Sequence, residues 1–312
     1  MMKFFNYEST SFVSRTFVFI IIIYVLVLSS LPAYHLSAVF NSASDAFHQG
    51  EMLGNVWHML AYYQGGANFP IFIHGGMDYW PSLIAKLCFG EDHIIFGTRL
   101  IVVLTTMISW MVFLNLGISL LLKVGANLTQ QMLFMGVFIL TLPFSNFSVM
   151  AIEESPVGMR DVVILCQAYF LFKYCYSDDA RKNYFLVFMF FLQPLAIYWA
   201  YDRGVASSFG CLAVILMLLK QRKFTEIIPL FLASALSFGL FELTHIGGTL
   251  SENITNIQYW ASHSKEVWGL RFHFRGSILF LMPICSLFLL FVYLFSERGS
   301  ISKDKLIWLA FL

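Results

Sequence analysis

Long apolar runs separated by short polar segments dominate the pattern along the chain. The runs fall at roughly 12–33, 99–122, 131–150, 162–177, 184–200, 205–219, 225–243 and 276–295, and a partial further run begins near 306. A membrane-spanning helix needs about 20 mostly apolar residues. The pattern therefore predicts an all-α polytopic integral membrane protein with about eight to nine transmembrane helices, forming a single transmembrane domain over residues 1–312.

The two ends of the sequence need separate interpretation. The run at 12–33 resembles a secretory signal in length, but further spans follow it, so we interpret it as a retained anchor helix. The last run has barely begun when the sequence stops at Leu312. We therefore expect a C-terminus that is truncated, or a final helix that is unusually short.

Composition agrees with a membrane protein and excludes other classes. Hydrophobic residues make up 59% of the chain and charged residues 12%, and the mean hydropathy is +0.74. Soluble domains carry about 25% charged residues. The net charge of +1 lacks the basic excess of a nucleic-acid-binding protein. The five cysteines have no paired or metal-type spacing, so neither a disulfide framework nor a zinc site is predicted.

Two longer connections stand out between the spans, at 34–98 and 244–275. In the first, apolar positions from Phe47 to about Tyr63 recur at helical spacing, which predicts an amphipathic helix on the membrane surface. Glycine pairs interrupt the pattern, and Tyr79–Phe89 is predicted to form a second short helix. The connection at 244–275 is rich in aromatic and cationic residues, which suit the boundary between water and lipid.

The distribution of lysine and arginine among the loops predicts the orientation of the chain in the membrane. The short turns on one side are basic, as in Lys220-Gln221-Arg222-Lys223, which favours a cytoplasmic N-terminus and places both long connections outside. All eight histidines and most of the acidic residues then fall on the outer side. Long outer loops explain part of this bias, but they do not by themselves require histidine.

The start of the first outer loop holds a candidate site. Asp45, His48 and Glu51 lie at helical spacing, and carboxylate and imidazole groups together can bind a divalent ion or move a proton. The alternative is that Asp45 caps the helix and the other two form a solvated face.

Two further outer turns hold ionisable residues close to the expected membrane boundary. Glu153 and Glu154 are followed by Arg160 and Asp161, and a tight turn between two later spans carries Asp202-Arg203. Ionisable groups near membrane depth are costly and usually have a partner or a function. The alternatives are a solvated turn for the first group and a structural ion pair for the second.

The arrangement of these outer segments resembles the GT-C superfamily of membrane glycosyltransferases. The likeness lies in a single span leading to a long first outer loop, in the acid-rich stretch from Asp45 to Glu51, in the run His74-Gly75-Gly76-Met77-Asp78-Tyr79-Trp80-Pro81-Ser82-Leu83, and in the acidic outer turn Glu153-Glu154. It covers roughly residues 10 to 245.

The resemblance implies transfer of a sugar from a polyprenyl-phosphate donor to an unidentified acceptor on the non-cytoplasmic side. Asp45 would act as the base, with Glu51, Glu153 and Glu154 as further catalytic residues. The leaving phosphate would be bound by arginines, of which the candidates are Arg160, Arg203, Arg271 and Arg275. A divalent ion, Mg²⁺ or Mn²⁺, would be held by Asp45, His48 and Glu51. The membrane would be the bacterial inner membrane with a periplasmic active site, and an endoplasmic reticulum membrane with a luminal site fits the same topology.

Two other functions stay open. A transporter would place ionisable groups near the bilayer midplane, whereas the predicted span centres are almost free of charge. A non-enzymatic assembly subunit is compatible with the sequence, and loss of catalysis after substitution of the outer acidic residues would count against it.

Overall fold

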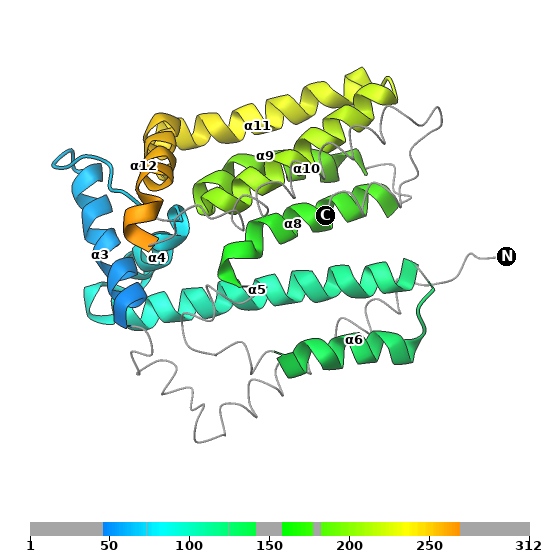
Figure 1. Cartoon of the computed structure of the whole chain (residues 1–312), viewed down its shortest axis with the longest axis horizontal. Coiled ribbons are helices and arrows are strands. Elements are labelled where there is room, and N and C mark those ends of the chain that lie inside the picture. Colours follow the sequence, from blue (N-terminus) through cyan, green and yellow to red (C-terminus); the bar gives the residue numbers. More distant parts are fainter. Residues whose placement is uncertain (1–45, 73, 124, 142–157, 177–181, 269–312) are drawn as a thin grey trace. The chain divides into compact units, whose positions relative to one another are not determined.

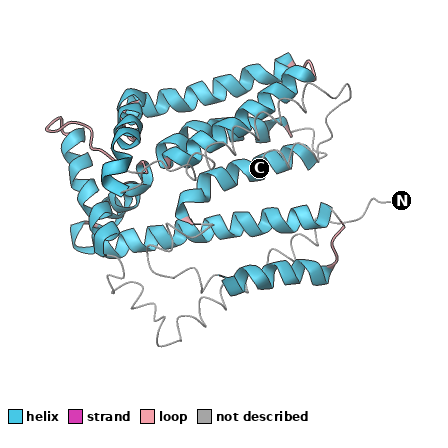
Figure 2. Cartoon of the chain, in the orientation of Figure 1, coloured by secondary structure: helices cyan, strands magenta, loops and turns pink. Residues whose placement is uncertain are grey.

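The computed structural model describes residues 46–72, 74–123, 125–141, 158–176 and 182–268, and within these ranges the chain is built from helices (Figure 1). Figure 2 shows helices and loops, and no strand, among the described residues. In chain order the elements are α3 (Ala46–Tyr63), the 3₁₀ turn η2 (Gly76–Asp78), α4 (Trp80–Phe89), the 3₁₀ turn η3 (Glu91–His93), α5 (Ile94–Lys123), α6 (Leu128–Thr141), the 3₁₀ turn η5 (Met159–Asp161), α8 (Val162–Tyr176), α9 (Asn183–Trp199), α10 (Tyr201–Lys220), α11 (Phe224–Thr244) and α12 (Leu250–Trp268).

The chain divides into two compact units. The first unit consists of Met1–Leu53 with Pro81–Val162, and the second consists of Gly54–Trp80 with Val163–Leu312. In the first unit α5 and α6 lie side by side (Figure 1). Leu114 and Ile118 of α5 pack against Met135 of α6, and these buried residues form an apolar cluster that joins the two helices.

The second unit is organised around α9, which packs against both α10 and α11 (Figure 1). Leu230 and Ala233 of α11 are buried, and Tyr198 at the end of α9 stacks on Phe241 with ring centroids 4.4 Å apart. The opposite side of α11 is exposed and apolar. A helix that is apolar on every side suits burial in a membrane rather than contact with water.

Three of the described helices are long and apolar enough to cross a membrane: Glu91–Lys123, Tyr201–Lys220 and Phe224–Thr244. They correspond to the predicted spans at 99–122, 205–219 and 225–243. The chain is thus an all-helical integral membrane protein over its described residues. The predicted spans at 131–150, 162–177 and 184–200 are represented by the shorter helices α6, α8 and α9. Those at 12–33, at 276–295 and from 306 lie outside the described residues.

Both helices predicted in the first outer loop are present as α3 and α4, within one residue of the expected starts and ends. The connection at 244–275 contains a helix that the sequence pattern does not reveal. This helix is α12, and it crosses the end of α11 instead of continuing along it (Figure 1).

A chain of amide and hydroxyl groups links three helices inside the second unit. The Nε2 of Gln167 on α8 donates to the Oε1 of Gln193 on α9 over 2.9 Å, and the same oxygen accepts from the hydroxyl of Ser207 on α10 over 2.7 Å. All three side chains are buried. Polar side chains that pair between apolar helices stabilise helix association where no water competes.

Candidate functional site

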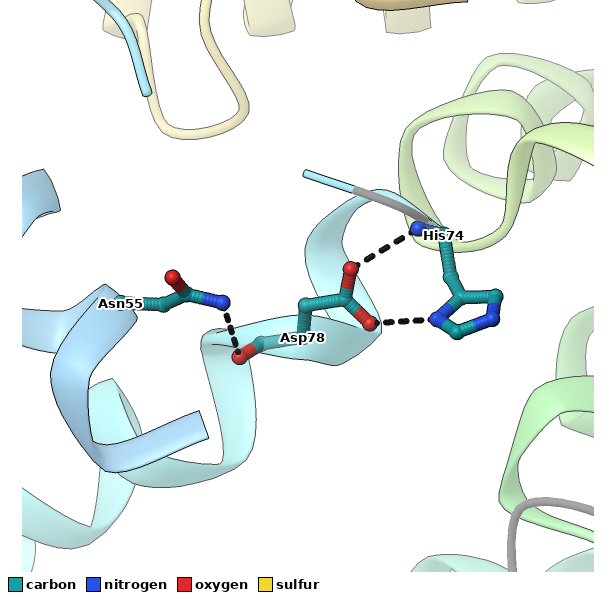
Figure 3. A network of polar contacts seen from close by, with 3 residues as sticks. All are labelled: Asn55, His74 and Asp78. Atoms are coloured by element: carbon teal, nitrogen blue, oxygen red, sulfur yellow. Dashed lines mark hydrogen bonds and ion pairs between the residues drawn. The ribbon is translucent and has the colours of Figure 1, made fainter. Parts of the chain in front are cut away.

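A histidine–aspartate pair lies in the segment between α3 and α4 (Figure 3). The Nδ1 of His74 lies 2.9 Å from Oδ1 of Asp78, and the backbone N–H of His74 donates to Oδ2 over 2.8 Å. The carboxylate thus takes both donors from one residue, which fixes the backbone and the imidazole ring together. The side chain of Asp78 is 4% exposed and that of His74 is 19% exposed, so the carboxylate is buried behind a partly accessible ring.

This pairing sets the protonation of the ring. A carboxylate can only accept, so the hydrogen bond to Asp78 requires the proton of a neutral imidazole to be on Nδ1. Nε2 is then the nitrogen with the lone pair. A histidine held in one tautomer by a carboxylate is arranged for general acid–base chemistry.

The segment around the pair is seated directly on the turn between α9 and α10. The carbonyl oxygen of His74 accepts a hydrogen bond from the backbone N–H of Tyr201 over 2.8 Å. Gly75 has a φ of 113°, in the region that favours glycine, and a Cβ atom on Gly76 would lie 2.8 Å from the carbonyl oxygen of Tyr198. Asn55 of α3 donates to the carbonyl oxygen of Asp78 over 3.3 Å (Figure 3). Helix α3 and the α9–α10 turn therefore hold the segment on two sides.

The first turn of α10 adds a cation to the same end of the unit. Arg203 pairs with Asp202 over 3.3 Å, and both side chains are exposed. These residues come directly after Tyr201, which bonds to His74. The N-terminal turn of a helix attracts anions, and a guanidinium suits phosphate oxygens.

A second polar cluster lies at the ends of α11 and α12. The hydroxyl of Tyr62 donates to Glu252 over 3.0 Å and lies 3.5 Å from Nδ1 of His245, while the hydroxyl of Tyr198 donates to Glu242 over 3.0 Å. Burial, together with the hydrogen bond and charge of Glu252, raises the pKa of Tyr62 from 10.0 to about 12. Tyr62 is therefore a neutral donor at physiological pH.

This second cluster has a clear structural role. Glu252 accepts from the backbone and side chain of Thr249, as in a capping box, and Glu242 accepts from the backbone N–H of Leu250. Both carboxylates thus stabilise the N-terminus of α12, where the helix dipole favours negative charge.

Aromatic donors fix the turn between α11 and α12. The carbonyl oxygen of Ile246 accepts from the hydroxyls of Tyr63 and Tyr79 over 2.6 and 3.0 Å, and from Nε1 of Trp80 over 3.3 Å. The residue before it, His245, has a φ of 51°, in the left-handed region. The segment that carries the histidine–aspartate pair is therefore tied to the α11–α12 turn as well as to α10.

Of the residues singled out in the sequence, Arg203 lies in the first turn of α10, two residues after Tyr201, whose backbone N–H bonds to His74. Arg160 lies on η5 in the first unit and is half-buried. His48 and Glu51 belong to α3, but their side chains lie outside the described part of the chain. Five further candidate residues, among them the expected base Asp45, lie wholly outside the described part of the chain: Asp45, Glu153, Glu154, Arg271 and Arg275.

The metal prediction stays a prediction. Within the described ranges no group of three His, Cys, Asp or Glu side chains is arranged to hold a metal ion. The three residues expected to bind Mg²⁺ or Mn²⁺ lie outside the side chains that the structure describes.

His74 and Asp78 were part of the run on which the family resemblance rests, but the sequence did not single them out as a pair. The available signal was the spacing of four residues around a glycine pair, which lets the chain turn back so that the carboxylate meets the ring.

Comparison with models of protein families, with characterised proteins and with solved structures finds no match. The fold and the site define the class: a helical integral membrane protein with a partly buried histidine–aspartate pair beside the first turn of a candidate span, α10.

Proposed function

We propose that the protein is a membrane glycosyltransferase that moves a sugar from a polyprenyl-phosphate donor to an acceptor hydroxyl on the non-cytoplasmic face. The observation that carries the proposal is the histidine–aspartate pair, held against the start of α10 by the hydrogen bond from Tyr201 to His74. A base at the end of a membrane span can meet a lipid-linked donor whose reactive group lies at the membrane surface.

In the proposed reaction, Nε2 of His74 takes the proton of the acceptor hydroxyl as that oxygen bonds to the anomeric carbon of the donor. The bond between the anomeric carbon and the phosphate oxygen breaks, and polyprenyl phosphate leaves with the bonding electron pair. Asp78 holds the ring and balances the imidazolium charge that develops. The resemblance assigns the base to Asp45, which lies outside the described residues. The role proposed here for His74 and Asp78 is a different assignment, based on the geometry of that pair.

The leaving phosphate needs positive charge. In the proposed site it comes from Arg203 and the backbone N–H groups of the first turn of α10, the helix whose first residue bonds to His74. The opposite end of the same helix carries Lys220, followed by Arg222 and Lys223. These cations support a cytoplasmic location for that end and a periplasmic or luminal location for the end with His74.

The direct test is donor consumption by the purified full chain in lipid nanodiscs. The protein is incubated with a panel of polyprenyl-phosphate hexoses and pentoses and with a total membrane extract as the source of acceptor, and release of polyprenyl phosphate is followed by mass spectrometry. His74→Gln is expected to lower release by on the order of 10²–10⁴-fold. His58→Gln is the matched control, because His58 is an exposed histidine of the same outer loop.

Release by the wild type and the His58 variant, together with its loss in a folded His74→Gln protein, would support the proposal. Failure of the wild type to consume any donor, or full activity of His74→Gln, would reject it. Folding of each variant is checked by thermal denaturation in the same nanodiscs.

A transporter is the second candidate, favoured by the buried chain of Gln167, Gln193 and Ser207 between α8, α9 and α10. Polar groups at membrane depth can line a substrate path. Substrate-dependent flux into proteoliposomes, without cleavage of a donor, would favour this function over glycosyl transfer.

A further inference from the structure

Helix α12 buries two polar residues and exposes a side of mixed polarity. Asn253 and Asn256 face inward and are only 2% and 3% exposed, whereas Leu250, Ile254 and Tyr259 are 38%, 44% and 38% exposed. A helix on a water-facing surface buries its apolar residues and exposes its polar ones. In α12 the asparagines depart from this rule, and the exposed side has an apolar edge at Leu250 and Ile254 next to polar positions at Ser251, Thr255 and Gln258. A helix with two such edges suits a boundary between lipid and water.

The inward asparagines have specific partners. The amide nitrogen of Asn253 donates to the carbonyl oxygens of Gly247 and Thr249 over 2.7 and 2.9 Å, and its oxygen accepts from the hydroxyl of Tyr201 over 2.7 Å. Asn256 donates to the carbonyl oxygen of Pro70 over 3.1 Å. These bonds fix the rotation of α12 about its axis, because buried amides are costly unless they are paired. The edge formed by Leu250 and Ile254 is therefore held outward.

The exposed side of α12 continues an apolar surface on α11. The large exposed apolar residues of α11 recur every three or four positions, with one adjacent pair, which places them on one face of the helix: Phe224, Ile228, Phe231, Leu232, Leu236, Leu240 and Leu243. Since α11 is a candidate span, this face suits the acyl chains of the bilayer. Leu243 is 82% exposed, Ile246 follows in the turn at 49%, and Leu250 and Ile254 extend the surface onto α12.

From these observations we infer that α12 is a lipid-binding helix that lies in the plane of the membrane, with Leu250 and Ile254 inserted at the boundary between headgroups and acyl chains. The crosswise course of α12 at the end of α11 matches this placement (Figure 1). Insertion of an apolar face to about 5–10 Å is typical of such helices.

The inference does not depend on glycosyl transfer, because lipid contact by α12 would anchor the α11–α12 turn whatever reaction the protein performs. The occupant is a lipid surface and not a protein, since the surface is continuous with the face that α11 presents along its whole length. A second copy of the chain, or a segment outside the described residues, is distinguished from lipid by the experiment.

The test places one spin label at a time in the full chain in nanodiscs, with the five native cysteines replaced. Ile254→Cys reports on α12. Leu232→Cys on the exposed face of α11 is the lipid reference, and Gln64→Cys in the exposed loop after α3 is the water reference. Collisions with oxygen, which concentrates in lipid, are compared with collisions with a water-soluble nickel chelate.

The ratio of oxygen to nickel collisions at position 254 is expected to be several-fold above that at position 64 and close to that at position 232. A ratio equal to that at position 64 overturns the inference, because the helix would then face water. Low collision rates with both reagents overturn it too, because protein would cover the helix. If the cysteine-free chain does not fold, a genetically encoded fluorescent residue at the same three positions, quenched by brominated lipid or by iodide, gives the same comparison.

Discussion

The backbone N–H of Tyr201, the first residue of α10, donates a 2.8 Å hydrogen bond to the carbonyl oxygen of His74. A helix start has N–H groups without partners inside the helix, and here one of them is satisfied by a residue from a distant part of the sequence. This hydrogen bond fixes the position of the His74 segment relative to α10. The segment that carries His74 and Asp78 is docked on a rigid helix end, so a change at the contact should move the imidazole.

Gly76 provides a test of this docking. A Cβ atom at this position would lie 2.8 Å from the carbonyl oxygen of Tyr198 and 2.9 Å from the ring of Trp80. Gly76→Ala is expected to destabilise the protein by about 1–3 kcal/mol, because backbone must shift to relieve the contact. Thermal denaturation in nanodiscs measures this. Gly54→Ala is the control, since a Cβ there meets no atom within 4 Å and alanine is the better helix former; equal loss in both variants would contradict close docking.

Gln193 is expected to be the main polar link between α8, α9 and α10. Its oxygen accepts from Gln167 and Ser207, and its nitrogen donates to the carbonyl oxygen of Gly204 over 3.0 Å. Gln193→Leu removes these three bonds, while Gln167 keeps its bond to the carbonyl oxygen of Met189 and Ser207 keeps its bond to that of Gly204. The expected loss is therefore about 1 kcal/mol. The thermal midpoint of Gln258→Leu, an exposed position on α12, serves as the reference and should stay near that of the wild type. Unchanged stability of Gln193→Leu would show that the bonds to Met189 and Gly204 suffice to hold the three helices together.

Helical periodicity could predict most of the described helices, because their buried faces are apolar. It predicted a span at 205–219, whereas α10 begins at Tyr201. The difference is the polar first turn, where Asp202 and Arg203 are helical but carry no hydrophobic signal. Helix α12 was missed for a related reason: its buried positions are asparagines, so the pattern of apolar residues does not mark the face that packs.

The candidate site was less predictable than the helices. The sequence places His74 and Asp78 four residues apart. It carries no sign that the backbone N–H of Tyr201 bonds to the carbonyl oxygen of His74. Nor does it indicate that the carbonyl oxygen of Ile246 accepts hydrogen bonds from Tyr63 and Tyr79. Such contacts join segments far apart in the chain, and local patterns carry no information on them. Arg203 was identified because a charge next to a membrane span is unusual whatever its partners are.

The raised pKa of Tyr62 leads us to expect that the folded protein loses stability at alkaline pH. Its pKa is raised to about 12 in the folded protein from 10.0, because burial and the carboxylate of Glu252 disfavour the phenolate. A raised pKa means that the stabilisation is fully present below about pH 10 and is lost as the pH rises toward 12. Thermal midpoints measured from pH 8 to 12 should therefore fall across this window.

The share of Tyr62 in this loss can be isolated by substitution. Tyr62→Phe has no phenol to ionise, so its midpoint should fall less steeply than that of the wild type, although it starts lower because the hydrogen bond to Glu252 is gone. Tyr184→Phe, at an exposed position on α9, should follow the wild-type curve. Parallel curves for Tyr62→Phe and the wild type would show that Tyr62 contributes nothing to the alkaline loss.

Asp78→Asn tests whether the buried carboxylate acts through His74. Asparagine has nearly the same shape, but its amide can donate to Nδ1 and so favours the tautomer with the proton on Nε2, which cannot accept a proton from the acceptor hydroxyl. Release of polyprenyl phosphate should fall by on the order of 10²–10⁴-fold.

Loss of the negative charge should also move the acid limb of the pH–rate profile to lower pH, because an imidazolium is less stable without the carboxylate. A purely structural role for Asp78 would lower the thermal midpoint and leave that limb in place. Asp92→Asn, at an exposed acidic residue of the same loop, should change neither the rate nor the profile.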